Sequence, residues 1–135
     1  VVALAMEKDG VTPSIIVHRG HVYHNDATIA HIPKSAKIVF LGSCGGYLSI
    51  ESVLEKSEEA HIISTQGTGT KLVNDHLLVN MDSTLLTQDT MNWKHFFEES
   101  EEALKGNADF SHYIGPQDNL YAQFLHTYLN AIQET

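Results

Sequence analysis

The sequence predicts a single α/β domain: a three-layer sandwich with a mainly parallel sheet between two layers of helices. At 135 residues the chain is long enough for one hydrophobic core and short for two. Its 42% hydrophobic and 19% charged residues are ordinary for a globular protein. Short β-branched runs alternate with stretches of helical spacing, and this alternation is typical of parallel sheets with right-handed crossover helices.

The first elements are a strand, a short helix and a second strand. After a short apolar segment at residues 1–5, the run 14–17 is continuous and rich in isoleucine and valine, as expected for a strand covered on both faces. Segment 25–32 predicts a short helix, because Asn or Asp can cap its start and a proline limits its end. The apolar run 38–41 is the second strand.

Four longer helices and one strand follow. The run 61–65 predicts a third strand, which leads into the glycine-containing loop 66–70. Gly106, which follows Lys105, is expected to end the helix that contains Trp93 and Leu104. Four groups of positions with helical spacing mark the four helices. They are Tyr47, Ile50, Val53 and Leu54; Leu72, Val73, His76, Leu77 and Met81; Trp93, Phe96, Phe97 and Leu104; and Tyr121, Phe124, Leu125, Tyr128, Leu129 and Ile132.

Charge and cysteine content exclude several classes of function. The formal net charge of −9 and only eight scattered Lys and Arg residues argue against binding nucleic acid or an anionic membrane surface. No apolar run has the length of a membrane span, so we expect no membrane insertion. One cysteine excludes an internal disulfide framework and a multi-cysteine zinc site. The chain does not begin with Met, so both the cytoplasm and export through an upstream signal are compatible with it.

Chemically useful side chains follow each predicted strand directly. His21 follows the first strand, Cys44 the second, and the loop 66–70 the third. Ligand sites of open parallel sheets form beyond the carboxyl ends of the strands, so we expect these three to gather at one edge. A thiol reacts as its thiolate, and a neighbouring imidazole can take its proton and later protonate a leaving amine. Cys44 is therefore the candidate nucleophile and His21 the candidate base.

Small residues around Cys44 fit the same chemistry. Glycines let a substrate backbone approach closely and expose N–H groups that can hold an oxyanion. We expect one oxyanion donor at the N–H of Cys44 or Gly45 and a second in the segment Gly20–Val22. Gln66, Gly67 and Thr68 are then expected to form the rim of a substrate cleft.

These motifs resemble those of the caspase–gingipain–separase class of cysteine peptidases, known as clan CD. Gly20-His21 resembles the Gly-His of that class, and Leu41-Gly-Ser-Cys-Gly-Gly46 resembles its nucleophile block, although Val22 stands where the class usually has glycine. The resemblance covers residues 14–66 and implies a caspase-like fold that cleaves peptide bonds through a His-Cys dyad without metal or other cofactor. In that class strand–helix units precede the histidine strand, and none precedes it here. We therefore expect residues 1–135 to be a single α/β domain or the carboxyl-terminal part of a caspase-like peptidase domain.

Other interpretations remain open. His18 is the alternative base, although on an extended strand it points away from the face that carries His21. Gly42-Ser-Cys-Gly-Gly46 also fits the nucleophile turn of glutamine amidotransferases, which place their histidine downstream. A third interpretation is a caspase-like binding or scaffold domain without catalysis. His18, His21 and His24 have the spacing of helix-borne metal ligands rather than strand-borne ones, so we expect no metal. Asp26 and Asp75 could orient the base or bind a basic side chain, but caps or surface positions are the simpler interpretation.

Overall fold

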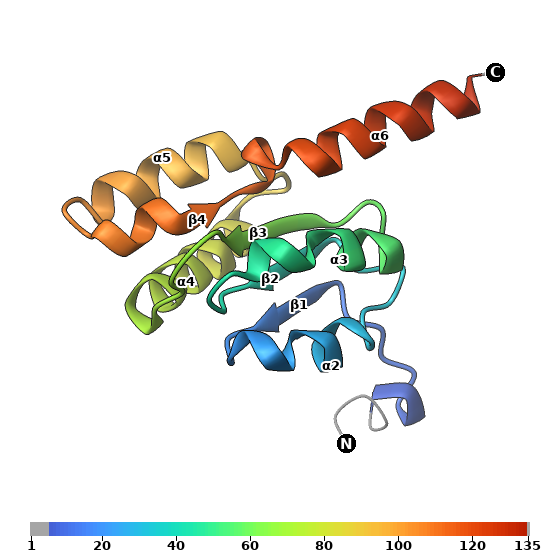
Figure 1. Cartoon of the computed structure of the whole chain (residues 1–135), viewed down its shortest axis with the longest axis horizontal. Helices are drawn as coiled ribbons and strands as arrows, with labels where there is room; N and C mark the ends of the chain where they lie inside the picture. The colour runs from blue at the N-terminus through green and yellow to red at the C-terminus, as the bar shows by residue number, and fades with distance from the viewer. Residues whose placement is uncertain (1–5, 135) are drawn as a thin grey trace.

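The molecule is an α/β fold with an open four-stranded sheet (Figure 1). The computed structural model describes residues 6–134, so the apolar segment at residues 1–5 lies outside the described part. The strands are β1 (Ile15–His18), β2 (Ile38–Leu41), β3 (His61–Thr65) and β4 (Tyr113–Ile114). The α-helices are α2 (Asn25–Ile29), α3 (Ile50–Lys56), α4 (Lys71–Thr87), α5 (Trp93–Ala103) and α6 (Leu120–Gln133). The short 3₁₀ helices are η1 (Val22–His24), η2 (Gly46–Ser49), η3 (Ala108–His112) and η4 (Pro116–Asp118).

The sheet order is β1-β2-β3-β4, and its first three strands are parallel. His18 of β1 lies opposite Leu41 of β2, so these strands end at the same level. The two-residue strand β4 runs antiparallel to β3 and was not predicted, because two residues carry no readable hydrophobic period. The coarse expectation of a mainly parallel α/β sheet is confirmed.

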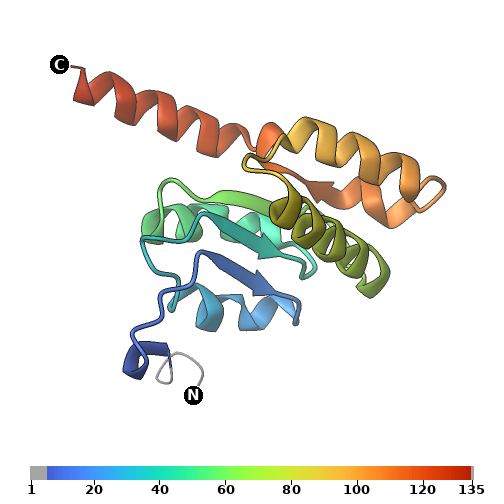
Figure 2. The same ribbon diagram turned by 180° about the vertical axis from the view of Figure 1, so that it is seen from behind.

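Two hydrophobic clusters lie on opposite faces of the sheet. Helices α2 and α3 pack on one face against Val39, Leu41 and Ile62. Helices α4 and α5 pack on the other face against residues such as Phe40 and Ile63 (Figure 2). The alternation of side chains along β2 and β3 separates the two clusters, which is why both strands read as continuous apolar runs.

One expectation about coverage is wrong, and one helix has little cover over its apolar stripe. The first strand was expected to be covered on both faces, but β1 is an edge strand of the described sheet, and Ile15 and Val17 are exposed. Helix α6 forms where its apolar stripe predicts, but it extends away from the sheet (Figure 1), and most of that stripe faces solvent. Hydrophobic spacing identifies a helix, but it does not say whether another element covers it.

Candidate functional site

The loops after β1, β2 and β3 lie side by side at one edge of the sheet. The Gly42 N–H donates to the His18 carbonyl oxygen at 2.9 Å, which joins the first two loops. The Gly45 N–H donates to the Gly67 carbonyl oxygen at 2.8 Å, which joins the second and third. Parallel strands produce this gathering because their carboxyl ends meet at the same edge.

Cys44 lies at the tip of the middle loop with an exposed side chain. Its Sγ lies 4.0 Å from the carbonyl oxygen of Gly69, within reach of a weak S–H hydrogen bond. The next residue, Gly45, has φ of 70°, in the left-handed region that glycine adopts most readily. Gly69 is needed for a different reason: a Cβ there would collide with the carbonyl group of Gly42. The glycines therefore let two loops pack tightly around the thiol.

The two candidate histidines have very different surroundings. His18 is 8% exposed; its Nδ1 lies 2.8 Å from Thr28 Oγ1 and its Nε2 lies 3.2 Å from the His21 carbonyl oxygen. Both ring nitrogens of His18 therefore have partners inside the protein. His21 is exposed, and its ring stacks on Tyr23 with centroids 5.2 Å apart. Of the two, His21 is the histidine whose ring is open to solvent.

His21 and Cys44 occupy equivalent places in the loops that follow two neighbouring strands. Each lies three residues beyond a partner in the register pair His18–Leu41. Among residues 6–134, however, no hydrogen bond joins the Cys44 thiol to an imidazole. The two groups thus lie on adjacent loops as exposed side chains rather than as a preformed hydrogen-bonded pair.

The amides expected to hold an oxyanion differ in availability. The Gly45 N–H is engaged with Gly67, as described above, and is not free to bind a substrate oxygen in this conformation. The N–H groups of Cys44 and Gly20 have no hydrogen-bond partner among the described residues. Val22 begins η1 with an exposed side chain. Cys44 and Gly20 therefore each offer a candidate donor, one on each loop.

The expected substrate rim contacts a histidine that the sequence did not single out. The Gln66 N–H donates to the His112 carbonyl oxygen at 2.8 Å, and the Thr68 N–H donates to His112 Nδ1 at 3.2 Å. A Cβ at Gly67 would lie 3.1 Å from the same ring. The loop 66–70 is thereby attached to the segment before β4, a contact that 44 residues of sequence separation conceal.

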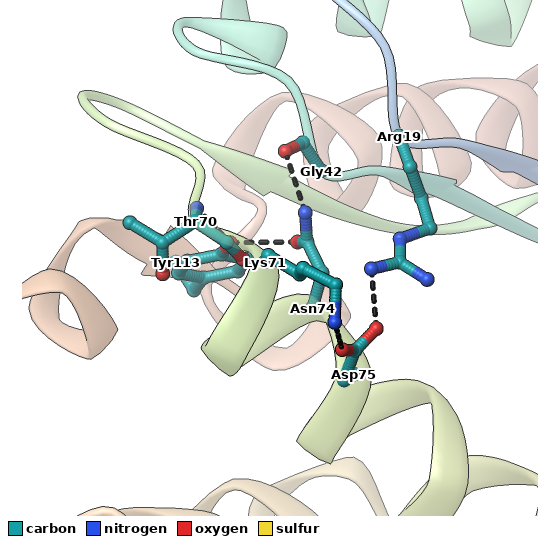
Figure 3. A network of polar contacts seen from close by, with 7 residues as sticks. All are labelled: Arg19, Gly42, Thr70, Lys71, Asn74, Asp75 and Tyr113. Atoms are coloured by element: carbon teal, nitrogen blue, oxygen red, sulfur yellow. Dashed lines mark hydrogen bonds and ion pairs between the residues drawn. The ribbon is translucent and has the colours of Figure 1, made fainter.

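A buried polar network supports the base of the site (Figure 3). Asn74 Nδ2 of α4 donates to the Gly42 carbonyl oxygen at 3.0 Å, and the Tyr113 hydroxyl donates to Asn74 Oδ1 at 2.6 Å. The same hydroxyl accepts from the Thr70 N–H at 3.0 Å. Burial raises the pKa of Tyr113, which keeps its hydroxyl protonated as a donor. The network fixes the start of the Cys44 loop to α4 and β4.

Charged groups beside this network pair with one another. Asp75 of α4 accepts hydrogen bonds from Lys71, at 2.8 Å, and from Arg19, the residue after β1. The hydrogen bond from Lys71 is the main cause that lowers the pKa of Asp75; desolvation opposes it, and the hydrogen bond and charge of Arg19 lower the pKa further. Asp75 is thus already bonded to two cations of this chain, and Figure 3 shows it below Gly42. Asp26 lies exposed in the first turn of α2, as a surface position would.

The remaining histidines do not build another centre. His61 begins β3, at the edge of the sheet opposite Cys44, and its Nδ1 accepts from Trp93 Nε1 at 2.7 Å. Burial, with smaller effects from the charges of His126 and Lys37, lowers the pKa of His61. His76 of α4 has a buried Nε2 without a hydrogen-bond partner among the described residues. Within residues 6–134, no three His, Cys, Asp or Glu side chains are grouped to hold a metal ion.

The sequence reasoning missed Asn25, Asn74, Tyr113 and His112. Asn25 was seen only as a helix cap, yet it is 1% exposed and bonds to the Cys44 loop. Asparagine can donate and accept hydrogen bonds at once, but the burial of Asn25 beside the glycine turn cannot be read from the sequence. Tyr113 and His112 lie too far along the chain for any local signal to connect them to Cys44.

A hollow of about 770 Å³ lies away from the candidate dyad. It is bordered by α5 and by the segment 104–118, with Phe97 and Phe110 among its lining residues, and neither Cys44 nor His21 lines it.

No helix within residues 6–134 combines the length and apolar character needed to cross a membrane. Comparison of the chain with protein-family models, with curated proteins and with solved structures finds no match.

Proposed function

We propose that the chain is a cysteine peptidase-like hydrolase in which Cys44 is the nucleophile and His21 is the general base and acid. The observation that carries the proposal is the equivalent placement of an exposed thiol and an exposed imidazole on the loops that follow two neighbouring parallel strands. The sequence resemblance to caspase–gingipain–separase peptidases supports it independently. An antiparallel fourth strand and a mainly parallel sheet are compatible with that class of fold.

The proposed reaction needs only these groups and water. His21 accepts the thiol proton, and the thiolate attacks the scissile carbonyl carbon while the Cys44 and Gly20 amides stabilise the oxyanion. The protonated His21 then gives its proton to the departing amine, which leaves a thioester on Cys44. Water, deprotonated by His21, hydrolyses the thioester, releases the carboxylic acid and restores the thiol.

The test is peptide hydrolysis by the purified chain. We would screen a tetrapeptide library with a fluorogenic leaving amine, and compare Cys44→Ala and His21→Ala with the control His24→Ala, which removes a neighbouring exposed histidine. Loss of cleavage in the first two variants and its retention in the control support the proposal. Absence of cleavage by the wild-type chain, or cleavage that survives either of the first two substitutions, overturns it.

A non-catalytic domain is the second candidate, and two observations favour it: the engaged Gly45 amide and the absence of a thiol–imidazole hydrogen bond in the described residues. Thiol reactivity separates the two. Iodoacetamide alkylates the thiolate, and an ordinary thiol is only a few per cent ionised at pH 7. In a dyad the His21 imidazole raises the thiolate fraction, so the rate of Cys44 alkylation depends on His21. A pH profile that is the same in wild type and His21→Ala would favour the non-catalytic domain.

A further inference from the structure

Asn25 connects the loop of His21 to the loop of Cys44. It is the first residue of α2, four residues after His21, and its side chain is 1% exposed. Its Oδ1 accepts from the hydroxyl of Ser43, the residue before Cys44, at 3.0 Å, and its Nδ2 donates to Ser49 Oγ at 3.2 Å. Because an amide both donates and accepts, one side chain ties the start and the end of the turn around Cys44 to the helix that follows His21.

The same helix holds the His21 backbone through a second contact. Thr28 of α2 hydrogen-bonds His18 Nδ1, which leaves His18 Nε2 as a donor to the His21 carbonyl oxygen. The His24 N–H donates to that oxygen as well, at 3.0 Å. The His21 backbone is therefore fixed relative to α2 while its ring stays exposed.

Ser43 is equally well fixed. It is buried, its carbonyl oxygen accepts from Thr65 Oγ1 of β3, and the Gly46 N–H after the thiol donates to that same hydroxyl at 3.2 Å. The turn 43–46 is thus fastened to β3 on one side and to Asn25 on the other. Of these bonds, the one between Asn25 and Ser43 connects the turn to α2, the helix that begins four residues after His21.

We propose that Asn25 is a positioning residue that sets the separation between His21 and Cys44; this rests on the proposed function. The buried amide ties the two loops together beside the Gly42–His18 backbone bond. In this proposal the exposed ring and thiol, which are not hydrogen-bonded to each other, meet by side-chain rotation. Loss of the amide frees the loops to separate, and a misplaced base transfers protons poorly even when the fold survives.

The test measures the rate of Cys44 alkylation against pH in Asn25→Leu, which keeps the number and branching of the side-chain heavy atoms and removes both hydrogen bonds. We expect the rate at pH 7 to fall roughly tenfold, as in His21→Ala, since the thiol then loses its base. The double variant Asn25→Leu/His21→Ala should react no more slowly than either single variant, because both changes disable the same pairing. Ser43→Ala, a milder change at the other end of the bond, should lower the rate in the same direction.

The control is Asn119→Leu. Asn119 is also 1% exposed, and its side chain accepts from the Ala122 N–H at the start of α6, away from the loops of His21 and Cys44. It should lower the melting temperature and leave the alkylation profile unchanged. Folding of each variant is checked by circular dichroism, and Ser43→Ala decides the matter if Asn25→Leu does not fold.

The two proposals fail in different ways. If His21→Ala leaves the alkylation profile of the otherwise wild-type chain unchanged, the dyad itself is wrong. If His21→Ala changes the profile while folded Asn25→Leu and Ser43→Ala keep it, the dyad stands and the positioning role of Asn25 is overturned. A fall in melting temperature alone, as in Asn119→Leu, would show that Asn25 is merely structural.

Discussion

Removing the Tyr113 hydroxyl should destabilise the fold by an amount that its contacts predict. The side chain is 7% exposed, and its hydroxyl donates to the buried Asn74 Oδ1 and accepts from the Thr70 N–H. Tyr113→Phe keeps the ring and opens almost no cavity, so the cost comes from partners left without hydrogen bonds. A buried polar atom in that state costs roughly 1–3 kcal/mol, and only Asn74 is nearly inaccessible to water. We therefore expect a loss of about 2 kcal/mol.

Urea unfolding followed by circular dichroism measures this loss. At about 4 °C per kcal/mol for a domain of this size, the melting temperature should fall by roughly 8 °C. Tyr128→Phe is the matched control, because Tyr128 is 55% exposed on α6, and removal of its hydroxyl should change stability by less than about 0.5 kcal/mol. A Tyr113→Phe variant as stable as Tyr128→Phe would refute the assignment of this network as a support of the Cys44 loop.

Two further predictions concern His61 and the left-handed glycines. Because the pKa of His61 is lowered in the folded chain, the unfolded chain takes up a proton first as the pH falls below the ordinary value of 6.5, so stability should decrease there. The slope of unfolding free energy against pH should be smaller in His61→Gln, and an unchanged slope would contradict the origin given for the shift. Gly45→Ala should cost about 1–2 kcal/mol in urea unfolding, because φ is 70° although a Cβ would meet nothing within 4 Å. Gly106→Ala, at φ of 85° and also in open space, should cost a similar amount, whereas a neutral Gly45→Ala would mean that the turn relaxes easily.

Local sequence patterns identified the three parallel strands and the α-helices that follow them because these patterns report local constraints. The strands 38–41 and 61–65 were placed correctly, because a short apolar run bounded by turn residues is typical of a buried strand. The last helix was also recognised from its spacing, but its exposure was not, because burial depends on whether another element lies over it. The edge position of β1 was missed for the same reason.

The candidate site shows the same division. Cys44 and His21 were selected as candidates from the strand ends alone, since parallel strands bring their carboxyl ends together at one edge of the sheet. The sequence could not decide between the rings of His18 and His21. The fold makes the distinction, because Thr28 and the His21 carbonyl oxygen occupy both nitrogens of His18.

The sequence by itself therefore determined the class of fold, the strands that lead to the site and the two side chains that we propose to react. Only the tertiary structure decided which amides are engaged, which histidine is enclosed, and which polar groups fasten the Cys44 loop. Those contacts join residues as far apart as Asn74 and Tyr113, or Asn25 and Ser43. Hydrogen-bond partners are chosen by proximity in space, and sequence periodicity carries no information about proximity between distant segments.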